Sequence, residues 1–262
     1  MTKEGASTKT LQRAFSILNA FSENDRSLTL TEITKRTQLP KSTVHRLLDM
    51  LDKHGVVNHG NDGRGYYPGH QLIYWGTLAQ NCLDIRAIAI PILQELVQKT
   101  SETAVLSVRH GHYGVWIEII ESTLPVRLSS RLGKPLSLHA GASSKILWAF
   151  LPENEIIEIM KTIDLQPIQT NTITDIGRMK EELNSICTRG FATSVEETDA
   201  GACGIAAPVY NHSGKLYAGI GIVAPLSRLD PEKFPSVAEH VVKAGMDLSM
   251  MLGWQKERKN DE

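Results

Sequence analysis

The chain has 262 residues, more than one compact domain usually holds, so two domains are expected. Hydrophobic residues make up 41% of the chain and charged residues 22%, which excludes wholesale disorder. The net charge of −1 hides an asymmetry, because residues 1–80 carry 10 Lys and Arg against 7 Asp and Glu, and the rest carry 18 against 22. A basic N-terminal part joined to an acidic larger part is typical of a nucleic-acid reader with an attached sensor.

Cysteine usage and hydropathy predict a protein of the reducing cytoplasm. The three cysteines, Cys82, Cys187 and Cys203, are an odd number without CxxC spacing, which argues against a disulfide framework or a zinc ribbon. No run approaches the ~18 apolar residues that a membrane span needs. The first ten residues are polar and lack the apolar core of a signal peptide.

In the N-terminal part, the apolar residues recur every three or four positions, as in one-faced helices, after a polar segment at residues 1–9 that we expect to be frayed. Pro40 suits the first turn of a helix and Gly55 the residue after its end. A Gly/Asn/Asp turn between two short extended runs predicts a hairpin. The predicted helices span residues 10–22, 31–37, 41–54 and 70–82, and the hairpin strands span residues 56–59 and 64–68.

In the larger C-terminal part, strands and helices with mostly hairpin-length connections predict a largely antiparallel α+β domain. The expected strands are residues 103–109, 114–120, 126–130, 191–196, 204–210 and 216–223. The expected helices are residues 84–100, 141–150, 153–162, 175–188 and 231–252.

The predicted helix at residues 41–54 carries polar side chains opposite its apolar stripe, near its N-terminus. Ser and Thr can donate to phosphates or base edges, Lys neutralises phosphate, and Arg pairs bidentately with guanine. Any solvated helix can show such a face, so the same pattern also fits a three-helix lobe without a ligand. Two helices, a tight turn, a third helix and a basic hairpin together favour DNA binding. The expected contacts are Arg13, Thr31, Lys41, Ser42, Thr43, His45 and Arg46, with His59, Arg64 and Tyr66 on the hairpin.

Residues 27–57, SLTLTEITKRTQLPKSTVHRLLDMLDKHGVV, resemble the helix-turn-helix of the isocitrate lyase regulator (IclR) family. Residues 133–152 and 189–225 resemble two further segments of that family. The resemblance implies a winged helix-turn-helix over residues 8–69, a linker helix over 70–83 and a GAF-like effector-binding domain over 84–254. It also implies double-stranded operator DNA and a small effector as partners, and a homodimer that can pair into a tetramer.

The same resemblance implies an effector site between the curved sheet and its loops. This chain has Ser144 where the family loop often has Gly. The positions whose polar groups hold carboxylate effectors in some members correspond here to Gly204, Gly221 and Val223, with Ser194 in place of an acidic residue, which predicts a roomier and less polar pocket. Such a pocket favours an aromatic or otherwise apolar acid over a small keto-acid. The implied effector residues are Leu128, Ser129, His139, Ala140, Gly141, Ala142, Ser143, Ser144, Ser194, Glu196, Cys203, Gly204, Gly221 and Val223.

Several of these residue types also have plain structural interpretations. A buried His is often a satisfied structural group, Lys145 can cap or pair, and Cys203 can be a small buried hydrophobe. Glu196 and Glu197 can serve only to orient backbone amides.

No enzymatic motif is present, and we expect neither catalysis nor a cofactor. Residue 142 is Ala, so Ser-x-x-Lys is not met, and no nucleophile elbow or dinucleotide loop occurs. His110 and His112 could chelate a metal from one strand face, but two ligands do not make a site. The alternative function is a sensing module that acts mainly through protein partners.

Overall fold

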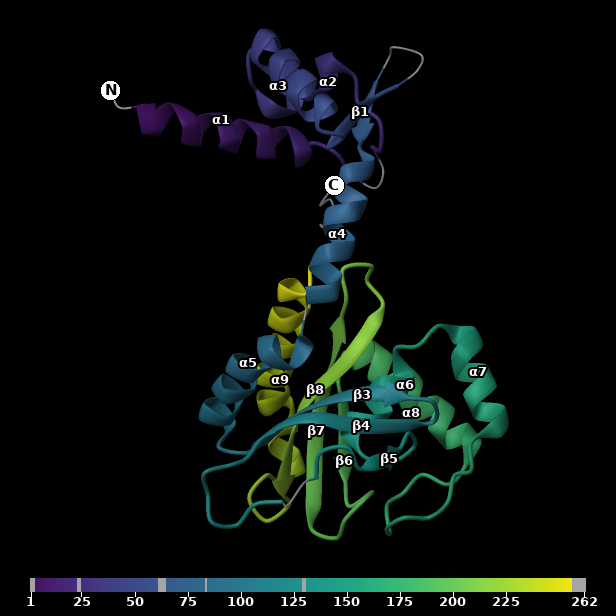
Figure 1. The fold of residues 1–262 in the computed structure, drawn as a ribbon. Helices are drawn as coiled ribbons and strands as arrows, with labels where there is room; N and C mark the ends of the chain where they lie inside the picture. Colours follow the sequence, from purple (N-terminus) through teal and green to yellow (C-terminus); the bar gives the residue numbers. More distant parts are fainter. Residues whose placement is uncertain (1–2, 23–24, 61–64, 83, 129–130, 256–262) are drawn as a thin grey trace. The chain divides into compact units, whose positions relative to one another are not determined.

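A computed structural model describes residues 3–22, 25–60, 65–82, 84–128 and 131–255. The chain forms two compact units, Met1–Leu83 and Asp84–Glu262. The first unit combines helices with a two-stranded sheet, and the second is a six-stranded sheet flanked by helices (Figure 1). None of the helices in these described ranges is both long enough and apolar enough to cross a bilayer.

The first unit has the predicted order of elements. Its helices are α1 (Lys3–Leu18), α2 (Leu30–Thr37), α3 (Lys41–Lys53) and α4 (His70–Cys82), and its antiparallel strands are β1 (Val57–His59) and β2 (Tyr66–Pro68). The predicted start of the first helix at Thr10 is wrong, because α1 begins at Lys3. The added segment contains Lys, Glu and Ala, which favour a helix without needing an apolar stripe.

Local sequence signals define the ends of α2 and α3. The Thr29 hydroxyl accepts from the Glu32 amide at 3.3 Å, and Glu32 accepts from the Thr29 amide at 2.7 Å, which is a capping box. Gln38 adopts a left-handed conformation with φ 55°, and Pro40 is the N-cap of α3. The apolar stripes of these helices and the hairpin then meet in one core: Ile17, Leu28, Ile33, Val44, Leu47, Leu48, Val57 and Tyr66.

The second unit is a single antiparallel sheet with strand order β5-β4-β3-β8-β7-β6. The strands are β3 (Thr103–His110), β4 (Tyr113–Ile120), β5 (Pro135–Ser137), β6 (Ala192–Val195), β7 (Ala202–Tyr210) and β8 (Leu216–Pro225). The helices are α5 (Ile85–Thr100), α6 (Ala142–Ala149), α7 (Glu153–Thr162), α8 (Ile176–Arg189) and α9 (Phe234–Met251), and the short 3-10 helix η1 (Pro231–Lys233) precedes α9.

Two apolar layers sandwich this sheet. Helices α5 and α9 cover one face, and α6 and α8 lie over the other (Figure 1). Every residue of α6 is buried, because Gly114 and Gly219 let it approach the strands closely. A Cβ at Gly219 would lie 2.6 Å from Ile146 Cγ2. The α+β prediction for this domain is confirmed.

One predicted strand is wrong. A strand was expected at residues 126–130. Residues 126–128 belong to no strand, and residues 129–130 lie outside the described residues. The edge of the sheet is instead β5, which pairs with β4 and begins at Pro135. Proline is tolerated at the first residue of an edge strand, but it lowers the strand signal in the sequence.

Candidate functional site

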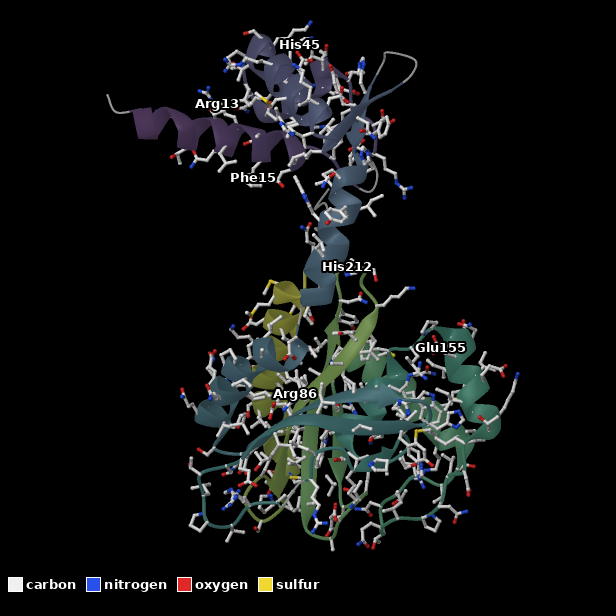
Figure 2. All side chains as sticks on the ribbon, viewed as in Figure 1. Arg13, Phe15, His45, Arg86, Glu155 and His212 are labelled. Carbon is white, nitrogen blue, oxygen red and sulfur yellow. The ribbon has the colours of Figure 1, made fainter. Side chains whose placement is uncertain are left out.

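The first candidate surface is the N-terminal half of α3. The buried stripe of this helix faces the core, so the side chains between the stripe positions point away from it. Lys41, Ser42, His45 and Arg46 are exposed, and Thr43 is half-buried. His45 of α3 (Figure 2) lies 3.2 Å from Asp49, measured from Nδ1 to Oδ2. The predicted polar face is therefore one continuous surface.

This surface combines free cations with a free helix end. No side chain caps α3, whose first amides have no acceptor within the helix. Within the described residues, Lys41 and Arg46 take part in no ion pair, whereas Arg36 of α2 pairs with Asp25 at 2.9 Å. Arg36 also donates to the Ala20 carbonyl at 2.9 Å, so its guanidinium is used inside the unit. Helix amides and unpaired cations suit a phosphate backbone.

The second candidate site is a cavity of about 380 Å³ in the second unit. It lies on the α6 face of the sheet, where the start of α6 meets strands from both halves of the sheet and two loops. The lining residues are Trp116, Leu128, Arg131, Lys134, Leu136, Ala140, Gly141, Ala142, Ser143, Ser144, Ser194, Thr198, Asp199, Ala202, Cys203, Gly204 and Val223.

The polar and charged residues of this cavity favour an anion. Ala142 and Ser143 are the first residues of α6, where amides have no acceptor within the helix. The exposed Arg131 and Lys134 add positive charge, and the exposed Asp199 adds one negative charge. Apolar side chains such as Trp116, Leu136 and Val223 share the rest of the wall with the hydroxyl-bearing Ser144, Ser194 and Thr198. The cavity therefore suits a small molecule with both an apolar body and an acidic group.

Two family models match the chain. The model described as "IclR helix-turn-helix domain" matches residues 10–59, and "Bacterial transcriptional regulator IclR C-terminal" matches residues 78–250. This chain belongs to the IclR family. The HTH-type transcriptional regulator KipR of Bacillus subtilis is 32% identical over 246 residues, which are 94% of this chain and 98% of KipR. The protein is thus a DNA-binding transcriptional regulator with an effector-binding domain, and not an enzyme.

Solved structures of IclR-type proteins share the fold. The Thermotoga maritima IclR crystal structure is 31% identical, with a TM-score of 0.63 over 94% of this chain and all of that chain (100%). An IclR homologue from Microbacterium hydrocarbonoxydans, crystallised with 4-hydroxybenzoate, is 24% identical, with a TM-score of 0.58 over 93% of this chain and 98% of that chain.

The IclR effector domain brings most of the predicted effector residues together around the cavity. The residues that line it are Leu128, Ala140, Gly141, Ala142, Ser143, Ser144, Ser194, Cys203, Gly204 and Val223. Ser129 lies outside the described residues. The other predicted residues, His139, Glu196 and Gly221, do not line the cavity.

These three residues have structural roles in this fold. His139 is buried, and its ring nitrogens lie 2.7 Å from the Ser137 hydroxyl and 2.9 Å from the Gln166 carbonyl. Glu196 accepts from the Gly201 amide at 2.7 Å and so holds the β6–β7 turn. A Cβ at Gly221 would lie 2.4 Å from the Ile205 carbonyl, so this glycine permits close strand contact.

Cys203 is both a lining residue and a core residue. Its thiol lies 3.4 Å from the Ala224 carbonyl and 3.5 Å from the Leu229 carbonyl, within the apolar layer under α5 and α9. Burial raises the pKa of Cys203 to about 12, so the group is a neutral thiol at pH 7. It presents no thiolate to a ligand.

One residue of the first unit that was predicted to contact DNA, Tyr66, is buried. Tyr66 is only 8% exposed and belongs to the core, and its ring centroid lies 4.5 Å from that of His59. Side chains alternate along a strand, so the neighbouring Tyr67 is the exposed one. Thr31 and Arg13 are exposed as expected, and Arg64 lies outside the described residues.

Sequence reasoning missed seven lining residues: Trp116, Arg131, Lys134, Leu136, Thr198, Asp199 and Ala202. Most lie in irregular connections, for which hydrophobic periodicity gives no orientation. The charged residues Arg131 and Lys134, close together in a segment with no helical period, were the one available signal.

The hypothesis that His110 and His112 chelate a metal from one strand face fails geometrically, because His112 lies in the β3–β4 turn. Among the described residues, no cluster of three potential ligands exists.

Proposed function

We propose that this regulator binds a palindromic operator as a homodimer and that a small organic acid in the effector-domain cavity modulates this binding. The observation that carries the proposal is the composition of the cavity. Its walls include Trp116, Leu136 and Val223, together with Ala142 and Ser143, the first two residues of α6. A helix N-terminus favours a carboxylate, and the apolar walls favour an aromatic or aliphatic body.

The proposed ligand class also agrees with one relative. The Microbacterium homologue was crystallised with 4-hydroxybenzoate, an acid with an aromatic ring. A cavity of about 380 Å³ lies at the small end of the usual range for ligand sites, about 300–1,000 Å³. We therefore use 4-hydroxybenzoate as the first probe compound.

DNA recognition is assigned to the exposed face of α3. In this proposal Arg46 and Ser42 read base edges in the major groove, while Lys41 and the helix N-terminus bind phosphate. His45 and Thr43 lie on or beside the same face, and Thr31 and Arg13 contact the backbone from α2 and α1. The effector would favour one arrangement of two such heads, with α4 as the connection.

Dimerisation is supported by apolar side chains left exposed on two helices. Leu11 and Phe15 of α1 are 59% and 56% exposed, and Phe15 lies on the opposite side of α1 from Arg13 (Figure 2). On α4, Ile73 is 73% exposed, and Trp75 and Leu78 are also exposed. Contiguous exposed apolar side chains mark interaction surfaces, and a two-fold dimer would read two half-sites.

The ligand is tested by thermal unfolding with benzoate, 4-hydroxybenzoate, pyruvate and 4-hydroxybenzamide. Aromatic acids should raise the melting temperature, because a ligand that binds only the folded state stabilises it. Arg131→Ala should weaken this effect, whereas Arg127→Ala should not, because Arg127 pairs with Glu121 at 3.0 Å and does not line the cavity. A shift with pyruvate alone would contradict the proposed ligand class.

DNA binding is tested by fluorescence anisotropy with duplex DNA from upstream of this protein's own gene. The affinity should fall steeply as salt rises, because several phosphates release counterions on binding. Absent or salt-insensitive binding would favour the alternative in which the regulator acts through protein partners.

A further inference from the structure

A buried ion pair lies beside the effector cavity. Lys145 is 1% exposed and Glu197 is 7% exposed, and Lys145 Nζ lies 2.6 Å from Glu197 Oε1. A second carboxylate, Glu182 of α8, accepts from the same ammonium group at 3.0 Å and from Arg189 at 3.0 Å. Neither Lys145 nor Glu197 lines the cavity.

The second oxygen of Glu197 reaches the start of α6. Glu197 Oε2 accepts a hydrogen bond from the Gly141 amide at 2.8 Å, and Gly141 is the N-cap of α6 with φ 85°. Gly141 has no side chain that could cap the helix, and Glu197, from a distant part of the chain, binds the amide of this N-cap residue. One carboxylate thus joins the N-cap of α6 to Lys145 in the next turn.

The contacts of Glu197 are better explained by the position of the start of α6 than by a net gain in folding stability. Burial raises the pKa of Glu197, and Lys145 opposes that shift, so the carboxylate is held at a desolvation cost. Buried ion pairs are often no more stabilising than apolar residues of similar size. The bond to Gly141, however, holds the residue directly before Ala142 and Ser143, and all three residues line the cavity.

We propose that Glu197 is a positioning residue for the effector carboxylate: through Gly141 it holds the Ala142 and Ser143 amides where that carboxylate binds. The inference rests on the proposed function, because it assumes an acid in this cavity. Lys145 orients Glu197, whereas Glu182 pairs with Lys145 and with Arg189. Neutralising Glu197 should therefore affect acid binding, whereas neutralising Glu182 should not.

The test compares Glu197→Gln with the matched control Glu182→Gln. Calorimetry measures binding of 4-hydroxybenzoate and of its neutral analogue 4-hydroxybenzamide, and ¹H–¹⁵N spectra follow the Gly141 amide. For Glu197→Gln we expect a shifted Gly141 signal and roughly 10- to 100-fold weaker binding of the acid, as for the loss of one charge-assisted contact. Binding of the amide should be unchanged, and Glu182→Gln should leave both compounds within about threefold of wild type.

Each contrary result has a distinct meaning. An unmoved Gly141 signal, or equal weakening of the acid and the amide, would overturn the positioning role of Glu197. If the wild-type protein bound neither compound, the proposed function would fail instead, and this inference with it. If Glu197→Gln does not fold, the double variant Lys145→Met/Glu197→Gln removes both charges together. This double variant should show the same loss of preference for 4-hydroxybenzoate over 4-hydroxybenzamide. A preference equal to that of the wild type would overturn the proposal.

Discussion

The two candidate sites of this regulator are built in opposite ways. The proposed DNA surface comes mainly from five residues within one short stretch of a single helix: Lys41, Ser42, Thr43, His45 and Arg46. The cavity takes its walls from residues spread between Trp116 and Val223. The first surface needs only a helix with one apolar face, whereas the second exists only when strands, loops and α6 meet.

This difference predicts different responses to substitution. Exposed side chains on one helix act nearly independently, so their replacement should change DNA binding and leave folding intact. The cavity shares a buried polar network with the core of its domain, so changes there should couple binding to stability. Four experiments test this comparison.

The largest expected effect is on the stability of the effector domain. Lys145→Met leaves the buried carboxylate of Glu197 without its partner, which costs about 3–5 kcal/mol when one member of a buried pair is removed. Urea unfolding followed by circular dichroism measures the loss. Lys215→Met, at an exposed position of the same unit, is the control and should change stability by less than about 0.5 kcal/mol. Equal free energies of unfolding for Lys145→Met and Lys215→Met would show that the Lys145–Glu197 ion pair does not stabilise the domain.

Arg46→Ala should weaken operator binding by about 1–3 kcal/mol and relax the preference at one base position. The free energy of unfolding should stay within about 0.5 kcal/mol of wild type, because Arg46 is exposed. Anisotropy titrations with singly substituted operators measure the preference. Lys53→Ala, on the last turn of α3, is the control for general charge loss. An unchanged base preference would remove Arg46 from the set of residues that read the sequence.

Thr29→Ala should cost about 1 kcal/mol of stability in the first unit, because it removes the capping box of α2. Thr31→Ala is the matched comparison, since Thr31 is exposed on the same helix and forms no part of that box. We expect Thr29→Ala to lower the urea midpoint and Thr31→Ala to lower DNA affinity. The reverse pattern would exchange the roles assigned to the two threonines.

The last effect is absent at neutral pH and appears only at alkaline pH. Burial raises the pKa values of Cys203 and Tyr210 to about 12, so the unfolded chain loses these protons first as the pH rises above 9. Stability is then full below pH 9 and falls as the pH rises toward 12. Urea midpoints between pH 8 and 11 should fall less steeply for Cys203→Ala than for wild type. Parallel slopes would show that the thiol is not protonated preferentially in the folded domain.

Much of the local structure could be predicted from the sequence. The signals at Pro40 and Gly55, and the apolar stripe of α3, located the helix-turn-helix because these signals act within a few residues. The strand expected at residues 126–130 was wrong, and Tyr66, expected to contact DNA from the hairpin, is buried in the core. Both errors concern short extended segments, where the face and the pairing partner depend on residues far along the chain.

The sequence by itself therefore determined the family, the order of the elements and the polar face of α3, because hydrophobic periodicity and caps are local properties. Only the tertiary structure decided that Arg131 and Lys134 border the same cavity as Ser194, and that Glu197 binds the N-cap amide of α6. These pairings follow from the antiparallel strand order and the close approach of α6 to its sheet. They are contacts between residues distant in the chain, and they form only when the whole domain packs.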